Sequence, residues 1–375
     1  MSWQKRFAGW LSQMAVPITA LAVLLLFNLI RDPAFFRISM RVNNNGNSVL
    51  SGNIISIIDS ASELAIIAMG MTLVTAACGG QDISVGCVGA ISGAVFIEAL
   101  LHWFNVDITV LTILGALVLS CLTAIVFKLF NGVLVAVFKI QPMIATLILY
   151  SCGRSIAYWI TGSATPQINS PIINNIGQTI PGIPIPTPVF AVVLMGCILA
   201  LLFRFTNLRL YTQTVGINQG AARLIGINPV VIKLLSFVIL GMCVAVASVI
   251  GIARMGNLSH KTILIDIEMD AILAVAIGGN SLGGGRFKIG GSIMGAYVIQ
   301  MLSTTLNAMI KEHPEQVKAF KAMVIILIVT AGSPVIQRLI VKLWKISLPL
   351  LRKLAMKLIQ LFKTLFGRKA PSPRG

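Results

Sequence analysis

The sequence predicts an all-α, polytopic membrane protein with about ten transmembrane helices and with its N- and C-termini in the cytoplasm. Hydrophobic residues make up 57% of its 375 residues and charged residues only 11%, whereas a soluble domain carries about 25% charged residues. Several apolar runs reach the roughly 20 residues that a helix needs to cross a bilayer. Lipid offers the backbone no hydrogen-bond partners, so the runs that cross it are expected to be helical.

Hydropathy and the cations between apolar runs place the individual spans. The first span follows "MSWQKRFAGW", and because no small-residue cleavage site comes after it, we expect a retained helix rather than a signal peptide. The eighth span is short for a membrane crossing. The ten expected spans cover residues 15–30, 54–77, 85–101, 108–127, 140–160, 189–203, 230–253, 269–278, 293–310 and 319–340.

Charges in the connections set the expected orientation. Lys128 and Lys139 flank "LFNGVLVAVF" and place that connection inside, as cations do for residues 204–233. Residues 161–188 carry no charge and many Pro, Gly and Asn residues, which predicts an extended external loop. An even number of spans then puts both ends in the cytoplasm, although the three arginines within residues 31–41 fall outside, against the charge rule.

The net charge of +18 is compatible with nucleic-acid binding, but its distribution argues for a membrane surface. No acidic residue follows Glu315, while cations continue beside apolar residues to the end of the chain, which is typical of cytoplasmic anchoring to anionic lipid. We divide the chain into a transmembrane domain, residues 1–343, and a basic amphipathic cytoplasmic tail, residues 344–375, on the inner leaflet. A regulatory or partner-binding tail is the alternative. Membrane lipids, not nucleic acids, are the expected partners.

The cysteines, the histidines and the glycine-rich segment indicate neither a metal site nor a catalytic residue. The six cysteines lie in apolar segments without a CxxC pair, and the three histidines are scattered near expected helix ends. We expect the thiols to be small buried hydrophobic groups. The glycine-rich "GGNSLGGGRFK" lacks the Gly-Lys-Ser/Thr of a phosphate-binding loop, a motif that occurs nowhere in the chain. The chain is therefore expected to hold no cofactor.

Two glycine pairs are expected to break helices at membrane depth and to permit close helix packing. They are Gly79 with Gly80, and Gly278 with Gly279. Asp82 follows the first pair and is expected to cap the next helix with its side chain.

Ionisable groups within spans are costly and mark functional candidates. Glu63 follows Asp59 by four residues, so the two carboxylates share a helix face and can border a polar translocation path. A helix-packing role is the alternative for each polar residue of such a path. The further side chains expected to line it are Asn131, Gln141, Thr146 and Arg154.

The stretch "GINQGAARLIGINP", residues 216–229, places a small, polar, Gly- and Ala-rich helix between two apolar runs. Small residues let another protein approach the backbone closely, and polar residues at the ends can cap the helix. We expect a docking helix for a cytoplasmic subunit, with a plain structural loop as the alternative. The residues expected to dock are Asn218, Gln219, Ala221, Arg223 and Gly226.

This stretch resembles the cytoplasmic coupling helix of ABC-transporter permeases for simple sugars, of the ribose and galactose type. Three further segments resemble that family in the same order: "GMTLVTAACGGQDISVGCVGAISGA", "NGVLVAVFKIQPMIATL" and "DAILAVAIGGNSLGGGRFKIGGSIMGA". The resemblance covers roughly residues 50–335 and is closest to the galactofuranose-type branch.

The resemblance implies that residues 1–343 form the permease domain of an ATP-driven importer in the bacterial plasma (inner) membrane. The implied substrate is a ribose- or galactose-like monosaccharide, and the chain itself is no enzyme. The implied partners are an ABC ATPase subunit that holds the ATP, an external or periplasmic sugar-binding protein, and a second permease subunit, identical or paralogous.

Several alternatives remain at this stage. Gln81 and the Gln219-Gly220 pair depart from the residues usual in the family, which leaves the substrate open. Nucleosides, branched-chain amino acids or a signalling sugar derivative are the alternatives within the family. A secondary transporter driven by protons or sodium, with Asp59 and Glu63 as its ion site, is a rival of another class. A membrane scaffold without transport activity is the third alternative.

Overall fold

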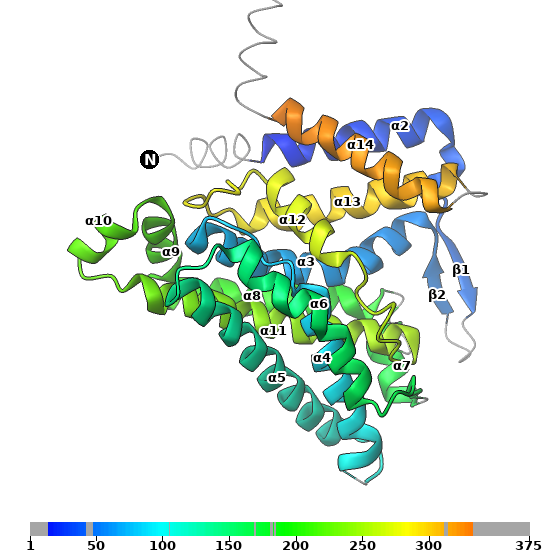
Figure 1. Ribbon diagram of the computed structural model, residues 1–375. Coiled ribbons are helices and arrows are strands. Elements are labelled where there is room, and N and C mark those ends of the chain that lie inside the picture. Colours follow the sequence, from blue (N-terminus) through cyan, green and yellow to red (C-terminus); the bar gives the residue numbers. More distant parts are fainter. Residues whose placement is uncertain are drawn as a thin grey trace, which may run out of the picture. The chain divides into compact units, whose positions relative to one another are not determined.

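A computed structural model describes residues 14–42, 48–104, 106–168, 170–180, 183, 185–310 and 314–332, which are mainly helical (Figure 1). The chain divides into two compact units, Met1–Met323 and Val324–Gly375. The helices from α2 to α13 belong to the first unit. The expected tail, residues 344–375, lies outside the described residues.

Seven helices of the described chain are long and apolar enough to cross a membrane: α3, α4 with its π-helical extension η2, α5, α6, α8, α11 and α13. Two other apolar helices are shorter, with 17 residues in α2 and 11 in α12. In chain order the elements are α2 (Ala15–Arg31), the 3-10 helix η1 (Pro33–Phe36), β1 (Ser39–Val42), β2 (Ser48–Ser51), α3 (Asn53–Cys78), α4 (Val85–Glu98), η2 (Ala99–Trp103), α5 (Val110–Ala136), α6 (Pro142–Ile160), α7 (Pro171–Gly177), α8 (Thr187–Phe205), α9 (Leu208–Ile217), α10 (Gln219–Leu224), α11 (Pro229–Met255), α12 (Ile267–Ile277), α13 (Ile289–Met309) and α14 (Pro314–Gly332).

The all-α class predicted from composition is confirmed in the described residues, and the long apolar runs form helices close to the expected positions. One expected span ends too early. Helix α5 continues past residue 127 to Ala136, so most of the stretch between Lys128 and Lys139 is helical. Lys128 is compatible with this helix because it is fully buried beside the carboxylate of Asp82.

Two segments between the expected spans contain short regular elements. Strands β1 and β2 pair as an antiparallel hairpin, with Ser39 opposite Ser51. Residues 161–188 are not extended throughout, since they contain α7. A proline at the start of α7 favours a helix N-terminus, and the fully buried Ile173 fixes the helix to its neighbours.

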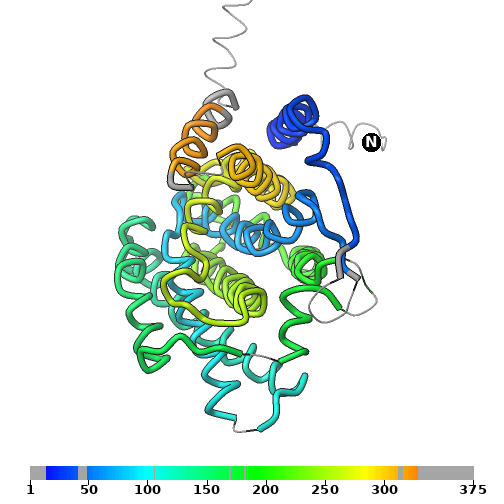
Figure 2. The backbone as a smooth tube through the Cα atoms, turned by 90° about the vertical axis from the view of Figure 1, so that its right-hand side faces the viewer, coloured from blue at the N-terminus to red at the C-terminus, as the bar shows by residue number. Residues whose placement is uncertain are grey.

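Helices α3 and α4 form the centre of the first unit. Every residue of α4 is buried, as expected for a helix that is apolar on all sides. Helix α4 packs against α5, α6 and α11, while α3 packs against α11 and α13. Figure 2 shows α3 lying between α13 and α11. Small residues permit this packing: the Oγ of Ser248 in α11 donates to the carbonyl of Gly89 in α4 at 2.6 Å.

Candidate functional site

Helices α9 and α10 lie together at one end of the first unit, and the β1–β2 hairpin lies at the opposite end (Figure 1). Asn218 separates the two helices with an extended backbone, and its side-chain Oδ1 accepts hydrogen bonds from the N–H groups of Gly220 (2.9 Å) and Ala221 (3.1 Å). This is an N-cap, which satisfies donors that a helix start leaves without partners. At the other end of α10, Gly226 has φ +83°, a left-handed conformation that favours glycine.

The surface of α10 is exposed, including large apolar side chains beside it. Of the six residues of α10 only Ala222 is buried, so Gln219, Ala221 and Arg223 are all exposed. Leu224 is 90% exposed and Ile225 is 68% exposed. Ile217, at the end of α9, is also exposed. Apolar side chains grouped on a polar, capped helix are typical of a surface that binds another protein.

Helix α9 connects this surface to the helical core. A Cβ on Gly216 would collide with the carbonyl oxygen of Ala76 near the end of α3. The same carbonyl accepts a hydrogen bond from the N–H of Gly285 at 3.0 Å. Helix α9 is therefore packed directly against the end of α3 and against the glycine-rich loop before α13.

The first predicted glycine turn lies at this junction, where Gly79 is in close contact with Gly283. Gly79 ends α3 with φ +64°, and its N–H donates to the carbonyl of Thr75 at 3.1 Å. Gly80 packs against the ring of Pro142. Gly279 also has a left-handed backbone, with φ +79°, while Gly278 is right-handed and packs against the backbone of α13.

Asp82 does not cap α4, contrary to the sequence-based expectation. The N-cap residue is Ser84, whose side chain makes no capping bond. Asp82 Oδ1 instead accepts from the backbone N–H (2.8 Å) and the Oγ (2.7 Å) of Ser84, and Oδ2 lies 2.8 Å from the Nζ of Lys128. Asn131 donates to the Ser84 Oγ at 2.9 Å. The Asp82 carboxylate pairs with Lys128 instead of capping α4, because a buried ammonium group needs an anionic partner.

Of two further residues expected on the translocation path, Thr146 supports the turn before α4 and Gln141 lies on the surface. Thr146 Oγ1 accepts from the N–H of Ile83 at 3.1 Å and donates to the carbonyl of Pro142 at 3.0 Å. Gln141 is exposed and precedes α6 without a side-chain cap. The structure therefore does not bring Asn131, Gln141 and Thr146 together with Asp59 and Glu63.

Asp59 and Glu63 both form ion pairs with Arg254, a residue that the sequence analysis did not identify as functional. Arg254, at the end of α11, makes an ion pair with Asp59 Oδ1 at 3.1 Å and with Glu63 Oε1 at 2.9 Å. It also donates to the carbonyl of Asp59 at 2.9 Å. The guanidinium group thus ties the end of α11 to the first turns of α3. An arginine directly after a long apolar run was the available signal, since two carboxylates within a span require a cation.

Glu63 and Arg254 line a cavity of about 340 Å³ together with polar side chains from other elements. Asp270 of α12 and Gln300 of α13 contribute to its wall, as does Thr262. Asp270 is paired with Lys321 at 2.7 Å. The cavity can offer both hydrogen-bond donors and acceptors to a small polar solute.

Arg154 holds the segment that leads from α11 to α12. Its Nη1 donates to the backbone carbonyls of His260 at 2.8 Å and Ile263 at 3.1 Å. Burial, and then the charges of Lys261 and Arg154, lower the pKa of His260. Arg154 therefore shapes one wall of the cavity through the backbone rather than by entering it.

The sequence profile of a protein family described as the branched-chain amino acid transport system / permease component matches residues 53–329. The galactofuranose transporter permease protein YtfT of Escherichia coli K12 is 37% identical over 88% of this chain and 92% of its own length. The fructose import permease protein FruF of Bifidobacterium longum is 33% identical over 92% of this chain and 93% of its own. The ribose import permease protein RbsC of Escherichia coli K12 is 30% identical over 87% and 95%. No solved structure gives a significant match.

Proposed function

The chain belongs to the family of permease components of branched-chain amino acid transport systems, and on this premise we propose that it is the membrane-spanning permease subunit of an ATP-driven ABC importer that translocates a monosaccharide. The observation that carries the proposal is the capped, exposed helix α10 with its apolar neighbours Leu224 and Ile225. A transporter driven by an ion gradient has no need for such a docking surface. An ABC permease requires one, because the ATP is hydrolysed on another subunit.

The substrate is a ribose- or galactose-like monosaccharide. Three relatives that align over most of this chain are named as sugar permeases, which favours a sugar over the amino acids in the family's description. The polar cavity beside Arg254 supports a hydroxyl-rich solute, since carboxylate, amide and guanidinium groups together recognise hydroxyl donors and acceptors.

The partners follow from the same role. An ABC ATPase subunit binds the ATP and receives α10, and the chain itself contains no phosphate-binding loop. An external or periplasmic binding protein delivers the sugar, and a second permease subunit, identical or paralogous, completes the pathway. Closure of the ATPase subunits moves α10 and α9, and the contact of Gly216 with Ala76 passes this movement to α3. The resulting rigid-body rearrangement exposes the pathway to the two sides in turn.

The proposed topology has ten spans, with both termini in the cytoplasm of a bacterium and the permease in its plasma (inner) membrane. Seven membrane-length helices in the described residues support a multi-pass arrangement. Helices α2, α12 and α14 supply the remaining spans of the proposal. In this orientation α10 faces the cytoplasm, and the Arg254 cavity lies toward the outer side.

Replacement of two exposed apolar residues beside α10 tests the proposal. The variant Leu224→Asp/Ile225→Asp should fold normally, because both side chains are more than half exposed. It should lose co-purification of the ATPase and sugar uptake by about tenfold or more, since an interface anchor contributes roughly 2 kcal/mol. The readouts are mass spectrometry of the complex from its native membrane and uptake of labelled sugar.

The matched control is Met40→Asp, which changes a 73% exposed apolar residue on the hairpin at the other end of the unit. This control should retain the ATPase. A Leu224→Asp/Ile225→Asp variant that keeps the ATPase and transports normally would remove the coupling role from α10. A wild-type chain that is repeatedly isolated without any ATPase would contradict the ABC proposal itself.

A further inference from the structure

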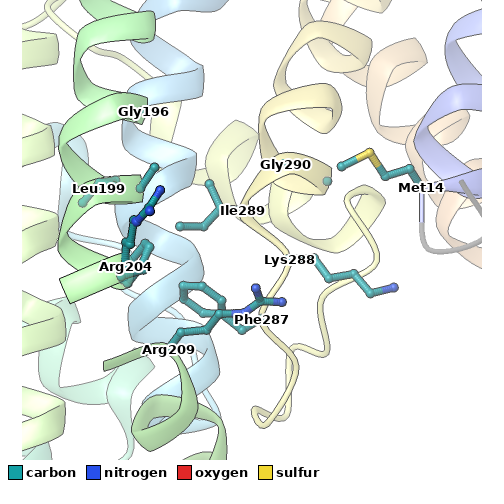
Figure 3. Close-up of a pocket in the computed structure, with 12 residues that line it drawn as sticks. Met14, Gly196, Leu199, Arg204, Arg209, Phe287, Lys288, Ile289 and Gly290 are labelled. Carbon is teal, nitrogen blue, oxygen red and sulfur yellow. The ribbon is translucent and has the colours of Figure 1, made fainter. Parts of the chain in front are cut away.

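A second cavity, of about 480 Å³, lies at the end of the first unit that carries α9 and α10. It is bordered by the last turns of α8, by α9 and by the start of α13, with Met14 before α2 on the far side. Figure 3 shows Arg204 and Arg209 on one side, Gly290 and Met14 on the other, and Phe287 and Ile289 between them. The role proposed for α10 does not involve this pocket.

The pocket combines an apolar wall with a cationic rim. Leu199 is 2% exposed and Phe287 is 3% exposed, and the rings of Phe203 and Phe287 contact edge to face at 5.2 Å between centroids. The guanidinium carbon of Arg209 lies 5.9 Å from the centre of the Phe287 ring, close enough for a cation–π contact. The aromatic wall therefore holds Arg209 at the pocket, and Arg204 is exposed beside it.

Three cations line the pocket: Arg204, Arg209 and Lys288. Among the residues that the structure describes, no Asp or Glu lines it. The stretches that supply the walls, residues 1–31, 108–265 and 271–311, contain no Asp or Glu at all. Burial, followed by the charge of Arg286, lowers the pKa of Lys288. A positive potential of this kind favours an anionic occupant.

The occupant must also be apolar along part of its length, because the pocket opens between helices of membrane-spanning character. Helices α8 and α13 are both long and apolar enough to cross a membrane. On the same face of α8 as the pocket-lining Gly196 and Ala200, Val193 continues the apolar wall with an exposed side chain. A free phosphate or an acidic peptide would leave this surface without a partner, whereas an acyl chain would cover it.

Neither end of the chain carries acidic residues that could neutralise the cations of the pocket rim. Residues 1–13 carry Lys5 and Arg6 and no acidic residue, and no acidic residue occurs after Glu315. Either end would place further cations beside Arg204 and Arg209. The occupant that balances the charge therefore comes from outside the chain.

We propose that this pocket binds one anionic phospholipid, with its phosphate headgroup at Arg204 and Arg209 and an acyl chain along α8. Basic pockets between transmembrane helices on the cytoplasmic side are suited to such headgroups. Because Arg209 belongs to α9, the lipid binds directly beside the helix that precedes α10. This site is separate from the sugar pathway, so the proposal does not depend on which solute is transported.

Native mass spectrometry of the full-length, delipidated permease tests the proposal with three probes: phosphatidylglycerol, phosphatidylethanolamine and glycerol 3-phosphate. Wild type should retain one phosphatidylglycerol in preference to phosphatidylethanolamine, and glycerol 3-phosphate should not displace it. Arg204→Gln/Arg209→Gln should weaken retention by about thirtyfold, since each cation near a lipid surface contributes about fivefold. Arg204→Lys/Arg209→Lys should keep binding, and this variant separates loss of charge from misfolding.

Lys139→Gln is the matched control, because Lys139 is an exposed cation that does not line the pocket. It should leave retention of phosphatidylglycerol unchanged. Equal retention by the Arg204→Gln/Arg209→Gln variant and this control would overturn the proposal. Equal retention of the two lipids, or displacement by glycerol 3-phosphate, would overturn it as well, in the latter case in favour of a site for soluble anions.

Discussion

Lys128 illustrates how a single buried charge is stabilised inside an apolar bundle. Its side chain has no exposed surface, and its Nζ lies 2.8 Å from Asp82 Oδ2 and 2.9 Å from Ser84 Oγ. Removing both charges from water is costly. The cost is offset because the ammonium group donates to the carboxylate and to Ser84 Oγ, and the carboxylate also accepts from the backbone N–H and the Oγ of Ser84. The pair also holds the start of α4 against α5.

Lys128→Met should therefore be strongly destabilising, because it leaves the Asp82 carboxylate buried without its cation. The expected loss is about 3–5 kcal/mol, and Asp82→Leu/Lys128→Met should recover much of it because no unpaired charge remains. Denaturant unfolding of the purified permease in detergent measures both values. Lys139→Met, at an exposed position, is the control, and a Lys128→Met protein as stable as this control would contradict the assignment.

At the level of helices, the contact between α9 and α3 depends on the absence of a side chain at one position. Gly216 leaves no room for a Cβ, since Ala76 O and the N–H of Gly285 lie in the place that a Cβ would occupy. Gly220, in α10, is exposed, and a Cβ there would meet only Asn218 Oδ1, at 3.2 Å. The two glycines thus allow a direct comparison within the same helix pair.

Gly216→Ala should destabilise the junction by about 1–3 kcal/mol, as overpacking does in a tight core. It should also weaken the hydrogen bond from Gly285 to Ala76, because the backbones must separate. Gly220→Ala should be neutral or slightly stabilising, since alanine favours helix by up to about 1 kcal/mol. Thermal unfolding of the two variants side by side measures the difference, and equal midpoints would show that the junction is not tightly packed.

For the first unit as a whole, polar clusters lie at both ends of an apolar helical core. One end carries α9 and α10, and the opposite end has the hairpin (Figure 1). The Arg254 ion pairs lie in the first turns of α3, which directly follows the hairpin. A rival mechanism uses Asp59 and Glu63 as a proton or sodium site. Both carboxylates are paired with Arg254 in the structure, so a coupling ion would have to compete with a guanidinium group.

Uptake of the labelled sugar by cells should continue when a protonophore and a sodium ionophore dissipate the gradients while cellular ATP is kept constant. It should stop when ATP is depleted and the gradients are maintained, because the proposed motion is driven by closure of the ATPase subunits. Measuring intracellular ATP in both arms controls for indirect effects. The opposite pattern of uptake would favour the gradient-driven rival.

The fold class, the multi-pass character and the positions of the long helices could be predicted from the chain alone, because they depend on local composition and length. The capped helix at residues 219–224 is local in the same way, since Asn218 and its hydrogen-bond donors are adjacent in sequence. Partnerships between distant residues could not be predicted. Arg254 and Asp59 are 195 positions apart, and Lys128 and Asp82 are 46 apart.

The sequence analysis grouped Asp59, Asn131 and Thr146 because they are polar side chains in or beside apolar spans, and polarity does not report which helices are neighbours. In the fold Asp59 pairs with Arg254, while Asn131 and Thr146 support the turn before α4. The same limit applies to the pocket between α8 and α13, whose cations come from three segments. Tertiary packing decides such sites, because the cost of burying a charge depends on the partner that the fold brings to it.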